Sequence, residues 1–224
     1  MAPQPHSNLA SNLSIQPYDP AQYIQTNMTG NRVSRKCHIM GSSNIILGGK
    51  CVIHHHVIVR GDLKKAASAM PPLAADATEA QQRAAQKGSQ IVVSIGRHSI
   101  LGEGCIIRPP YKAYKGAFSY YPIKIGDHVI IGAGSILEAA VVGSCVDIGR
   151  NVIIGKFAVI KDGVRILDNS VLAPGQVVIS GTVWGGSPAK CLGELSENFM
   201  VIHEARTKDY YARFRPGPAA GTEK

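Results

Sequence analysis

The chain has 224 residues, 45% of them hydrophobic, and its 24 lysines and arginines exceed its 15 acidic residues, giving a net charge of +9. This length suits one domain with one core, and the charge suits nucleic acid, anionic lipid or an acidic protein partner. No helix-turn-helix, zinc-finger or aromatic RNA-binding motif accompanies the charge. We therefore expect no nucleic-acid ligand. No apolar run reaches the length of a signal peptide or of a membrane span, so we also expect a soluble intracellular protein with no direct membrane insertion.

Residues 1–20 are rich in Pro, Ser, Asn and Gln, which predicts a mobile leader. From residue 21 to residue 190, aliphatic side chains recur at every sixth position in three sets. The first two sets are Met40, Ile46, Val52 and Ile58, and then Ile95, Leu101 and Ile107. The third set is Ile125, Ile131, Leu137, Val142, Ile148, Ile154, Ile160, Ile166, Leu172, Val178 and Trp184.

A fixed period this short predicts a solenoid. Each hexad forms a short strand and a corner, and three hexads make one triangular coil with the aliphatic residue inside. Successive coils stack about 4.8 Å apart through parallel hydrogen bonding. Glycine often follows the aliphatic residue, and we attribute this to a corner that avoids Cβ strain. The single five-residue step, from Leu137 to Val142, predicts a tightened corner and a local irregularity without functional meaning.

Two segments interrupt the period. Residues 64–90 are rich in Ala and Gln and predict an inserted surface loop, although Thr78–Lys87 has the propensity for a short helix. Residues 109–122 contain five aromatic residues and form an aromatic and basic loop.

A helical pattern follows over residues 191–215, and residues 216–224 predict a mobile tail. Ser196 and Glu197 suit the start of this helix. We expect the helix to cover an open end of the prism or to lie along one of its faces. Its predicted apolar side is Leu195, Phe199, Ile202, Ala205 and Tyr210.

Histidine and cysteine residues give no sign of a catalytic, cofactor or metal site. The five cysteines are well separated, without a C-x-x-C pair, and predict reduced thiols that are mostly buried. His54, His55 and His56 are consecutive, so their side chains point in different directions and cannot share one ion. His98 and His128 each stand just after a corner, where a solvated polar residue is ordinary.

The aliphatic-Gly hexads resemble those of the hexapeptide-repeat superfamily, whose fold is a left-handed parallel β-helix. The resemblance implies an all-β prism with a C-terminal α-helix, and the superfamily contains acyltransferases, γ-class carbonic anhydrases and non-catalytic assembly subunits. Arg60-Gly61-Asp62 resembles an element of the carbonic anhydrases. However, the positions of their zinc ligands hold Arg108, Ala133 and Glu138, which disfavours a zinc enzyme. Trp184–Lys190 resembles the end of acyltransferase prisms, but no catalytic constellation accompanies it.

Over roughly residues 22–215, the chain resembles the dynactin subunit 5 family. The motifs that carry the resemblance are Thr29–Arg35, Ile107–Pro110 with Lys112, Lys115 and Gly116, Ile125–Val129, Ile166–Asn169, and Lys208–Tyr211 with Phe214. The resemblance implies a non-catalytic subunit of the dynactin pointed-end complex, which is cytoplasmic and cytoskeleton-associated. Such a subunit helps to cap the actin-like filament and to recruit cargo or adaptors for cytoplasmic dynein.

The partners implied are dynactin subunit 6, the pointed-end actin-related protein, the zinc-binding dynactin subunit 4, and dynein adaptors or cargo. We expect partner binding through charged residues of the coils and through the aromatic loop, since aromatic and arginine side chains are common hot spots. These candidates are Arg60, Asp62, Arg108, Tyr111, Lys112, Tyr114, Lys115, Tyr120 and Tyr121. The alternatives are a loop that only folds back on the prism and, for the whole chain, a homotrimeric enzyme.

Overall fold

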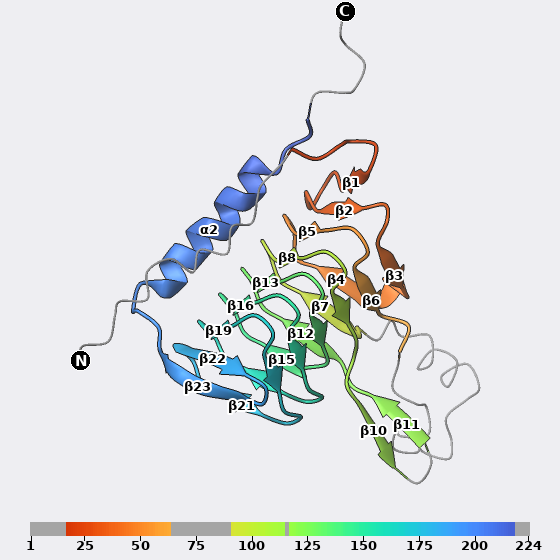
Figure 1. Cartoon of the computed structure of the whole chain (residues 1–224). Coiled ribbons are helices and arrows are strands. Elements are labelled where there is room, and N and C mark those ends of the chain that lie inside the picture. Colours follow the sequence, from red (N-terminus) through yellow and green to blue (C-terminus); the bar gives the residue numbers. More distant parts are fainter. Residues whose placement is uncertain (1–16, 64–90, 115–116, 218–224) are drawn as a thin grey trace, which may run out of the picture.

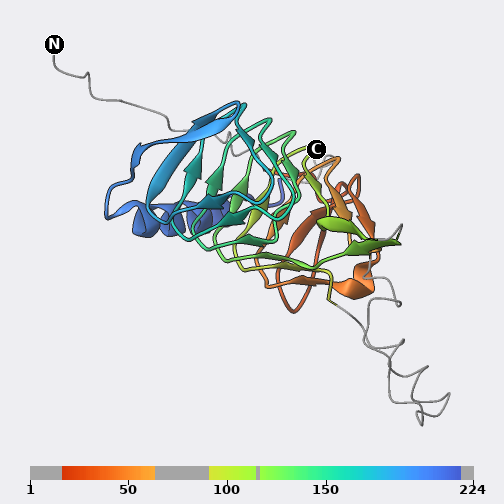
Figure 2. The same cartoon turned by 90° about the horizontal axis from the view of Figure 1, so that it is seen from below.

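The computed structural model describes residues 17–63, 91–114 and 117–217. The predicted left-handed β-helix is confirmed: three sheets wrap around a triangular prism, whose cross-section is visible in Figure 2. Predictions that concern residues 1–16, 64–90, 115–116 and 218–224 lie outside the described residues. They include the inserted loop and Lys115.

The first face of the prism is a nine-stranded sheet, parallel except for antiparallel strands at its two edges. Its strands, in spatial order, are β1 (Tyr23–Gln25), β2 (Arg32–Ser34), β5 (Val52–Ile53), β8 (Ile100–Leu101), β13 (Ile130–Ile131), β16 (Asp147–Ile148), β19 (Arg165–Ile166), β22 (Thr182–Gly186) and β23 (Ala189–Glu194). The edge strands β1 and β23 therefore close the two ends of this sheet.

The second and third faces are six-stranded parallel sheets. The second face is β3 (His38–Met40), β6 (Ile58–Arg60), β9 (Ile106–Ile107), β14 (Ile136–Leu137), β17 (Ile153–Ile154) and β20 (Val171–Leu172). The third face is β4 (Ile45–Leu47), β7 (Val93–Ile95), β12 (Ile123–Ile125), β15 (Val141–Val142), β18 (Val159–Ile160) and β21 (Val177–Val178). A 3-10 helix, η1 (Ser42–Asn44), a hairpin of β10 (Tyr111–Tyr114) and β11 (Ala117–Tyr120), and α2 (Phe199–Arg213) complete the described elements.

The inward positions of the second and third hexad sets agree with the prediction, and those of the first set do not. Met40 and Ile46 are 41% and 47% exposed. The residues in register with the core positions of the next coil are instead Leu47, Ile53 and Val59. The strands of this part of the chain are apolar on both sides, so a count of six residues does not determine which side faces inward.

The glycine after each inward residue has a different role from the one predicted. Left-handed backbone falls three residues after the inward position, as at His128 (φ 58°) and Asn151 (φ 53°). The glycine itself is a point of close approach between coils, since a Cβ atom on Gly132 would lie 2.3 Å from the carbonyl oxygen of Gly149. Stacking of the coils, rather than backbone strain, therefore requires glycine there.

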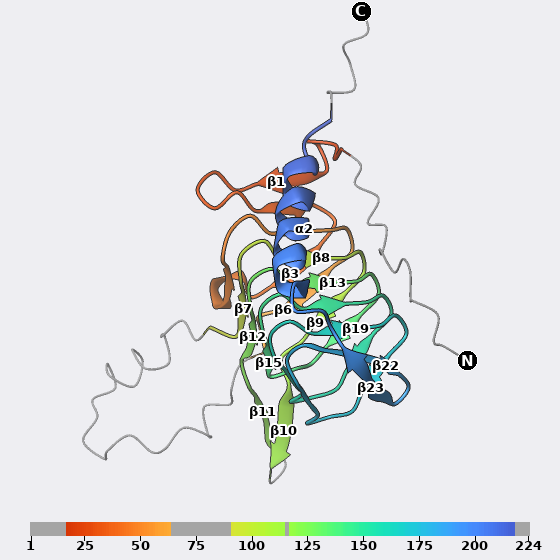
Figure 3. The same ribbon diagram turned by 90° about the vertical axis from the view of Figure 1, so that its left-hand side faces the viewer.

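Helix α2 lies along the first face, not over an open end (Figures 1 and 3). We predicted a helical segment over residues 191–215, but α2 begins only at Phe199. The first residues of the predicted segment belong instead to β23, which ends at Glu194. The predicted apolar side is right at Tyr210, which is buried, and wrong at Ile202 and Ala205, which are exposed. The other two buried residues of the helix, His203 and Thr207, are polar. Polar groups on the first face pair with the polar side of α2.

The described ends of the chain meet. The Tyr18 backbone N–H donates to the carbonyl oxygen of Arg215, and the Gly217 N–H donates to that of Tyr18. The residues nearest the prism in the predicted leader and tail are therefore fixed together. Of the five free thiols, Cys51, Cys105 and Cys145 are buried, as expected. No helix in the described part of the chain is long and apolar enough to span a membrane.

Candidate functional site

The departures from the regular coil lie at one corner, between the second and third faces. In the first coil η1 occupies this corner, in the second coil residues 64–90 connect β6 to β7, and in the third coil the hairpin β10–β11 is inserted (Figure 1). In the fourth coil the five-residue step joins β14 to β15 at the same place. We call the described residues between the strands of these two faces, with the hairpin, the irregular corner. The segments that break the six-residue repeat, such as η1, the hairpin and the five-residue step, therefore lie at one corner of the prism.

Arg60 and Asp62 form an ion pair at the second coil of this corner. The Nε and Nη2 atoms of Arg60 donate to the two carboxylate oxygens of Asp62, each at 2.8 Å. These hydrogen bonds lower the pKa of the Asp62 carboxyl and raise the pKa of the Arg60 guanidinium. The two parallel hydrogen bonds hold the pair in one geometry. Both side chains remain about one third exposed, so the pair also faces solvent.

Arg108 pairs with Glu138 between the third and fourth coils. The Arg108 Nε atom donates to Glu138 Oε1 at 2.5 Å, and the Glu138 side chain is only 11% exposed. Ala133 lies at a different corner, between β13 and β14. The three positions that hold zinc ligands in the carbonic anhydrases thus contain an ion pair and a methyl group. Among the described residues, no cluster of three or more His, Cys, Asp or Glu side chains could hold a metal ion.

Removing one partner of the Arg108–Glu138 pair tests its strength. Glu138→Gln, Arg108→Gln and the double variant form a cycle whose coupling energy we expect to be about 1 kcal/mol, since Arg108 is half-exposed. Chemical denaturation measures the free energy of unfolding of each variant. A coupling energy near zero would show that the contact contributes nothing to stability.

The hairpin β10–β11 folds its base onto the fifth coil. The ring of Tyr111 contacts those of Phe118 and Tyr120 at centroid distances of 5.6 and 5.7 Å. The ammonium of Lys156, from the fifth coil, lies 3.6 Å from the centroid of the Tyr111 ring. Tyr111 is therefore held from both sides, by its own hairpin and by the prism.

A second set of contacts continues this arrangement around Phe157. The ring of Tyr121 meets that of Phe157 at 5.4 Å, edge to face, and Lys112 Nζ lies 4.9 Å from the Phe157 centroid. The hairpin thus passes the fourth coil to reach the fifth. The shortened corner belongs to the fourth coil, between the coil that carries the hairpin and the coil that the hairpin contacts. The five-residue step, which we expected to be incidental, therefore lies at the same corner as the hairpin.

The structure brings most of the predicted partner-binding residues to the irregular corner. Tyr111, Lys112, Tyr120 and Tyr121 form one cluster, with Arg60 and Arg108 at the same corner of the second and third coils. Lys115 and the side chain of Tyr114 lie outside the described residues. Sequence reasoning missed Lys156 and Phe157. Counting by whole coils would have found them, because Lys156 stands one coil after Glu138.

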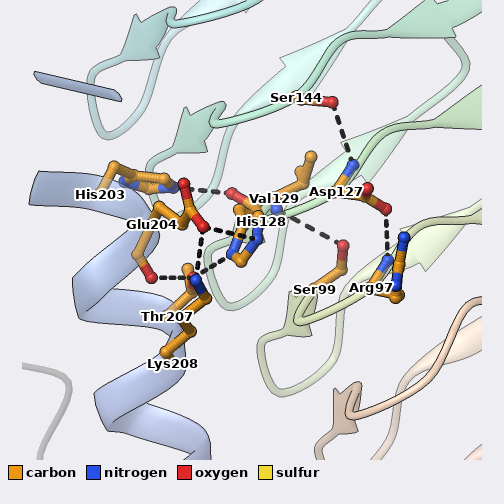
Figure 4. Close-up of polar contacts among 10 residues, drawn as sticks. All are labelled: Arg97, Ser99, Asp127, His128, Val129, Ser144, His203, Glu204, Thr207 and Lys208. Carbon is orange, nitrogen blue, oxygen red and sulfur yellow. Dashed lines mark hydrogen bonds and ion pairs between the residues drawn. The ribbon is translucent and has the colours of Figure 1, made fainter. Parts of the chain in front are cut away.

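Polar residues between α2 and the first face form the other candidate site (Figure 4). Thr207 donates its hydroxyl to the Glu204 carbonyl and accepts from His128 Nδ1 at 2.6 Å, while His203 Nε2 donates to the His128 carbonyl at 2.9 Å. His98 stacks on His128 with a centroid distance of 5.2 Å. The two histidines predicted as solvated are thus partly covered, and burial lowers the pKa of His128. Because Thr207 is fully buried, its hydroxyl cannot meet a substrate. These groups fasten α2 to the prism.

A family model described as Dynactin subunit 5 matches residues 77–219, more than half of the chain. The chain belongs to the dynactin subunit 5 family. The protein named Dynactin subunit 5 from Dictyostelium discoideum is 37% identical over 134 residues, which are 59% of this chain and 54% of that protein. This member of the dynactin subunit 5 family therefore matches about half the length of that relative.

Proteins named as enzymes are also similar to this chain. Gamma carbonic anhydrase 2, mitochondrial, from Arabidopsis thaliana is 32% identical over 95 residues, which are 40% of this chain and 32% of that protein. A solved hexapeptide transferase family protein from Anaplasma phagocytophilum superposes with a TM-score of 0.54 and 20% identity, covering 85% of this chain and 94% of that one. The structural likeness shows a common β-helix fold. It does not extend to activity.

Proposed function

We propose that this chain is a non-catalytic assembly subunit of the dynactin pointed-end complex, cytoplasmic and associated with the cytoskeleton. The observation that carries the proposal is the irregular corner, which presents fixed ion pairs and an aromatic-lysine cluster on a rigid prism. Its partners would be dynactin subunit 6, the pointed-end actin-related protein, the zinc-binding dynactin subunit 4, and adaptors or cargo. The role would be to help cap the actin-like filament and to recruit those adaptors or cargo for cytoplasmic dynein.

The physical character of the corner supports partner binding. Tyr111 and Tyr121 are held by ring and ammonium contacts before any partner arrives, so little conformational entropy is lost on association. Phe118, near the tip of the hairpin, is exposed and offers an apolar anchor. Lysines beside these rings and the net charge of +9 favour a partner surface rich in carboxylates.

The chemistry present at the corner disfavours the enzyme alternative. A catalytic zinc site needs about three protein ligands and an open position. Arg108 and Glu138 are instead paired with each other. A guanidinium held by a carboxylate can neither bind a metal nor act as a general base.

A pull-down of the full chain tests the proposal. In the variant Phe118→Ser with Lys112→Glu, we expect recovery of dynactin chains to fall about tenfold, because an apolar anchor is lost and a charge is reversed. Leu192→Ser is the matched control, since Leu192 is also an exposed apolar strand residue but lies on β23, away from the corner. Circular dichroism should show that both variants remain folded, although loss of the Lys112–Phe157 contact should lower the melting temperature of the hairpin variant by about 2–4 °C.

Two results would contradict the proposal. Recovery of dynactin chains at wild-type levels by the hairpin variant would remove the corner from the interface. Gel filtration that shows the wild-type chain as a lone homotrimer with stoichiometric zinc would favour the enzyme alternative over the assembly subunit.

A further inference from the structure

The second face carries an unbroken row of aliphatic side chains on its outer side. Ile58 pairs with Ile106, Ile106 with Ile136, Ile136 with Ile153, and Ile153 with Val171, one residue in each of five neighbouring coils. In each strand the next residue is buried in the core, so these residues face outward. We call this row the aliphatic ladder.

The other two faces differ from the second. On the first face, α2 packs over outward residues such as Ile130 and Asp147. On the third face, Ser94 and Lys124 interrupt the outward row between Ile46 and Val141. On the second face Ile153 is 46% exposed and the other four ladder residues are half-buried. Among the described elements, α2 lies on the first face and the hairpin stands at the irregular corner. The ladder is therefore an apolar surface without a described cover.

The ladder is too small to form an interface alone. Five coils at about 4.8 Å give a row of about 19 Å, whereas a stable interface buries about 800 Å² on each side. The two corners beside the face must contribute the remaining area. One of them is the irregular corner, so the ladder continues directly into the proposed partner-binding site.

The borders of the second face are mainly basic. Arg35 and Lys36 are exposed beside β3 on one border, and Lys156 stands on the other. None of these three has a carboxylate partner among the described ion pairs, whereas Arg60 and Arg108 do. On the first of these borders Glu103 and Asp168 are acidic, and Asp168 is paired with Arg150, so the pair adds no net charge. Net positive charge therefore surrounds the aliphatic ladder, and the complementary surface carries carboxylates.

We infer that the second face and its borders dock one partner, a flat aliphatic surface of a separate protein chain bordered by carboxylates. This inference rests on the proposed function as an assembly subunit. A straight row on the outside of a sheet suits a flat surface, whereas a lone amphipathic helix is held in a groove. A second copy of this chain would bring basic borders against basic borders.

The two longest segments of the chain outside the structure, residues 1–16 and 64–90, do not carry the complementary charge. Residues 1–16 contain no Asp or Glu. Residues 64–90 contain Asp76 and Glu79, but also Lys64, Lys65, Arg83 and Lys87. Neither segment offers a net acidic border, so a separate chain is the better complement.

Paired lysine substitutions test the inference in the full chain. In Ile136→Lys with Ile153→Lys, we expect recovery of the partner to fall about tenfold or more, because two charges enter an apolar contact. The control is Val177→Lys with Ile179→Lys, two exposed aliphatic residues on and just after β21 of the third face, and its recovery should match the wild type. Thermal melting monitors folding of both variants. Recovery by the wild type should decrease as salt is raised.

A photo-crosslinking side chain, p-benzoylphenylalanine at position 153, identifies the occupant. The expected result is a crosslink to a separate chain, at an apolar surface bordered by Asp or Glu. A crosslink to residues 1–16 or 64–90, a crosslink to a second copy, or no crosslink would overturn the inference.

The two proposals can fail separately. If dynactin chains are recovered equally by the wild type and the Ile136/Ile153 variant, the docking face is wrong and the proposed function stands. If the crosslinked chain has the expected surface but belongs to no dynactin complex, the docking face stands and the proposed function is wrong.

Discussion

Replacing Gly132 with alanine is expected to lower the free energy of unfolding by about 3 kcal/mol, with a fall in melting temperature of about 6–12 °C. The new Cβ atom would lie 2.3 Å from the carbonyl oxygen of Gly149 and 2.4 Å from its carbonyl carbon. Both atoms belong to the backbone of the next coil. They cannot move away without lengthening the hydrogen bond between Gly132 N–H and the Ile148 carbonyl, which joins the two coils. Chemical and thermal denaturation measure the loss.

Gly104→Ala is the matched control for Gly132→Ala. Gly104 has left-handed backbone, with φ of 66°, but apart from its chain neighbours no atom lies within 4 Å of the place that a Cβ atom would take. Alanine at this position should lower the free energy of unfolding by only about 1 kcal/mol, the cost of left-handed backbone for a residue with a Cβ atom. If Gly104→Ala destabilised the protein as much as Gly132→Ala, backbone strain rather than close approach of the coils would explain the repeated glycines.

The six-residue count predicted the fold because one inward side chain per strand is enough to define a coil. Ile125, Ile131 and Leu137 are buried as the count requires. The count failed at Met40 and Ile46, where both sides of a strand are apolar and the phase is ambiguous. What resolves the phase is the pairing with the next coil, which a single sequence does not display.

The sequence identified single residues of the irregular corner but not the contacts between them. The sequence singled out Tyr111 and Arg108, and it showed that Arg108 and Glu138 replace metal ligands. It did not show that these two residues pair, or that Lys156 supports Tyr111. Those contacts depend on which corners are stacked, and the insertions obscure the count between coils.

Helix α2 was misread for a different physical reason. Apolar periodicity identifies the buried side of a helix only when the surface beneath it is apolar. Here His203 and Arg206 reach polar groups of the first face, the His128 carbonyl and the Asp147 carboxylate. Met200, Val201 and Ile202 are left exposed.

Lowering the pH from about 7 to about 4 is expected to weaken the attachment of α2 to the prism. His54 lies under the end of α2, with Nε2 2.7 Å from the Tyr210 hydroxyl and Nδ1 3.2 Å from the Tyr23 hydroxyl. Burial, with a smaller contribution from the neighbouring His55, lowers the pKa of His54 from 6.5 to about 4. A pKa difference of this size corresponds to about 3 kcal/mol.

The direction of the effect follows from proton binding. Between about pH 4 and pH 6.5, the unfolded chain binds a proton at His54 that the folded chain excludes. The stability associated with neutral His54 is therefore fully present above pH 6.5 and is lost as the pH falls to about 4. Burial also lowers the pKa of His98 and His128, beneath α2, and of His203, on α2 itself, so these groups act in the same direction.

Denaturation at a series of pH values, with hydrogen exchange over residues 199–213, measures this loss. His54→Gln keeps a side chain that can bond to the Tyr210 and Tyr23 hydroxyls but does not titrate, so its stability should depend less steeply on pH. His56→Gln is the control, because His56 is exposed at a corner and should leave the pH dependence unchanged. An equal slope for His54→Gln and the wild type would mean that the neutral imidazole of His54 does not hold α2 in place.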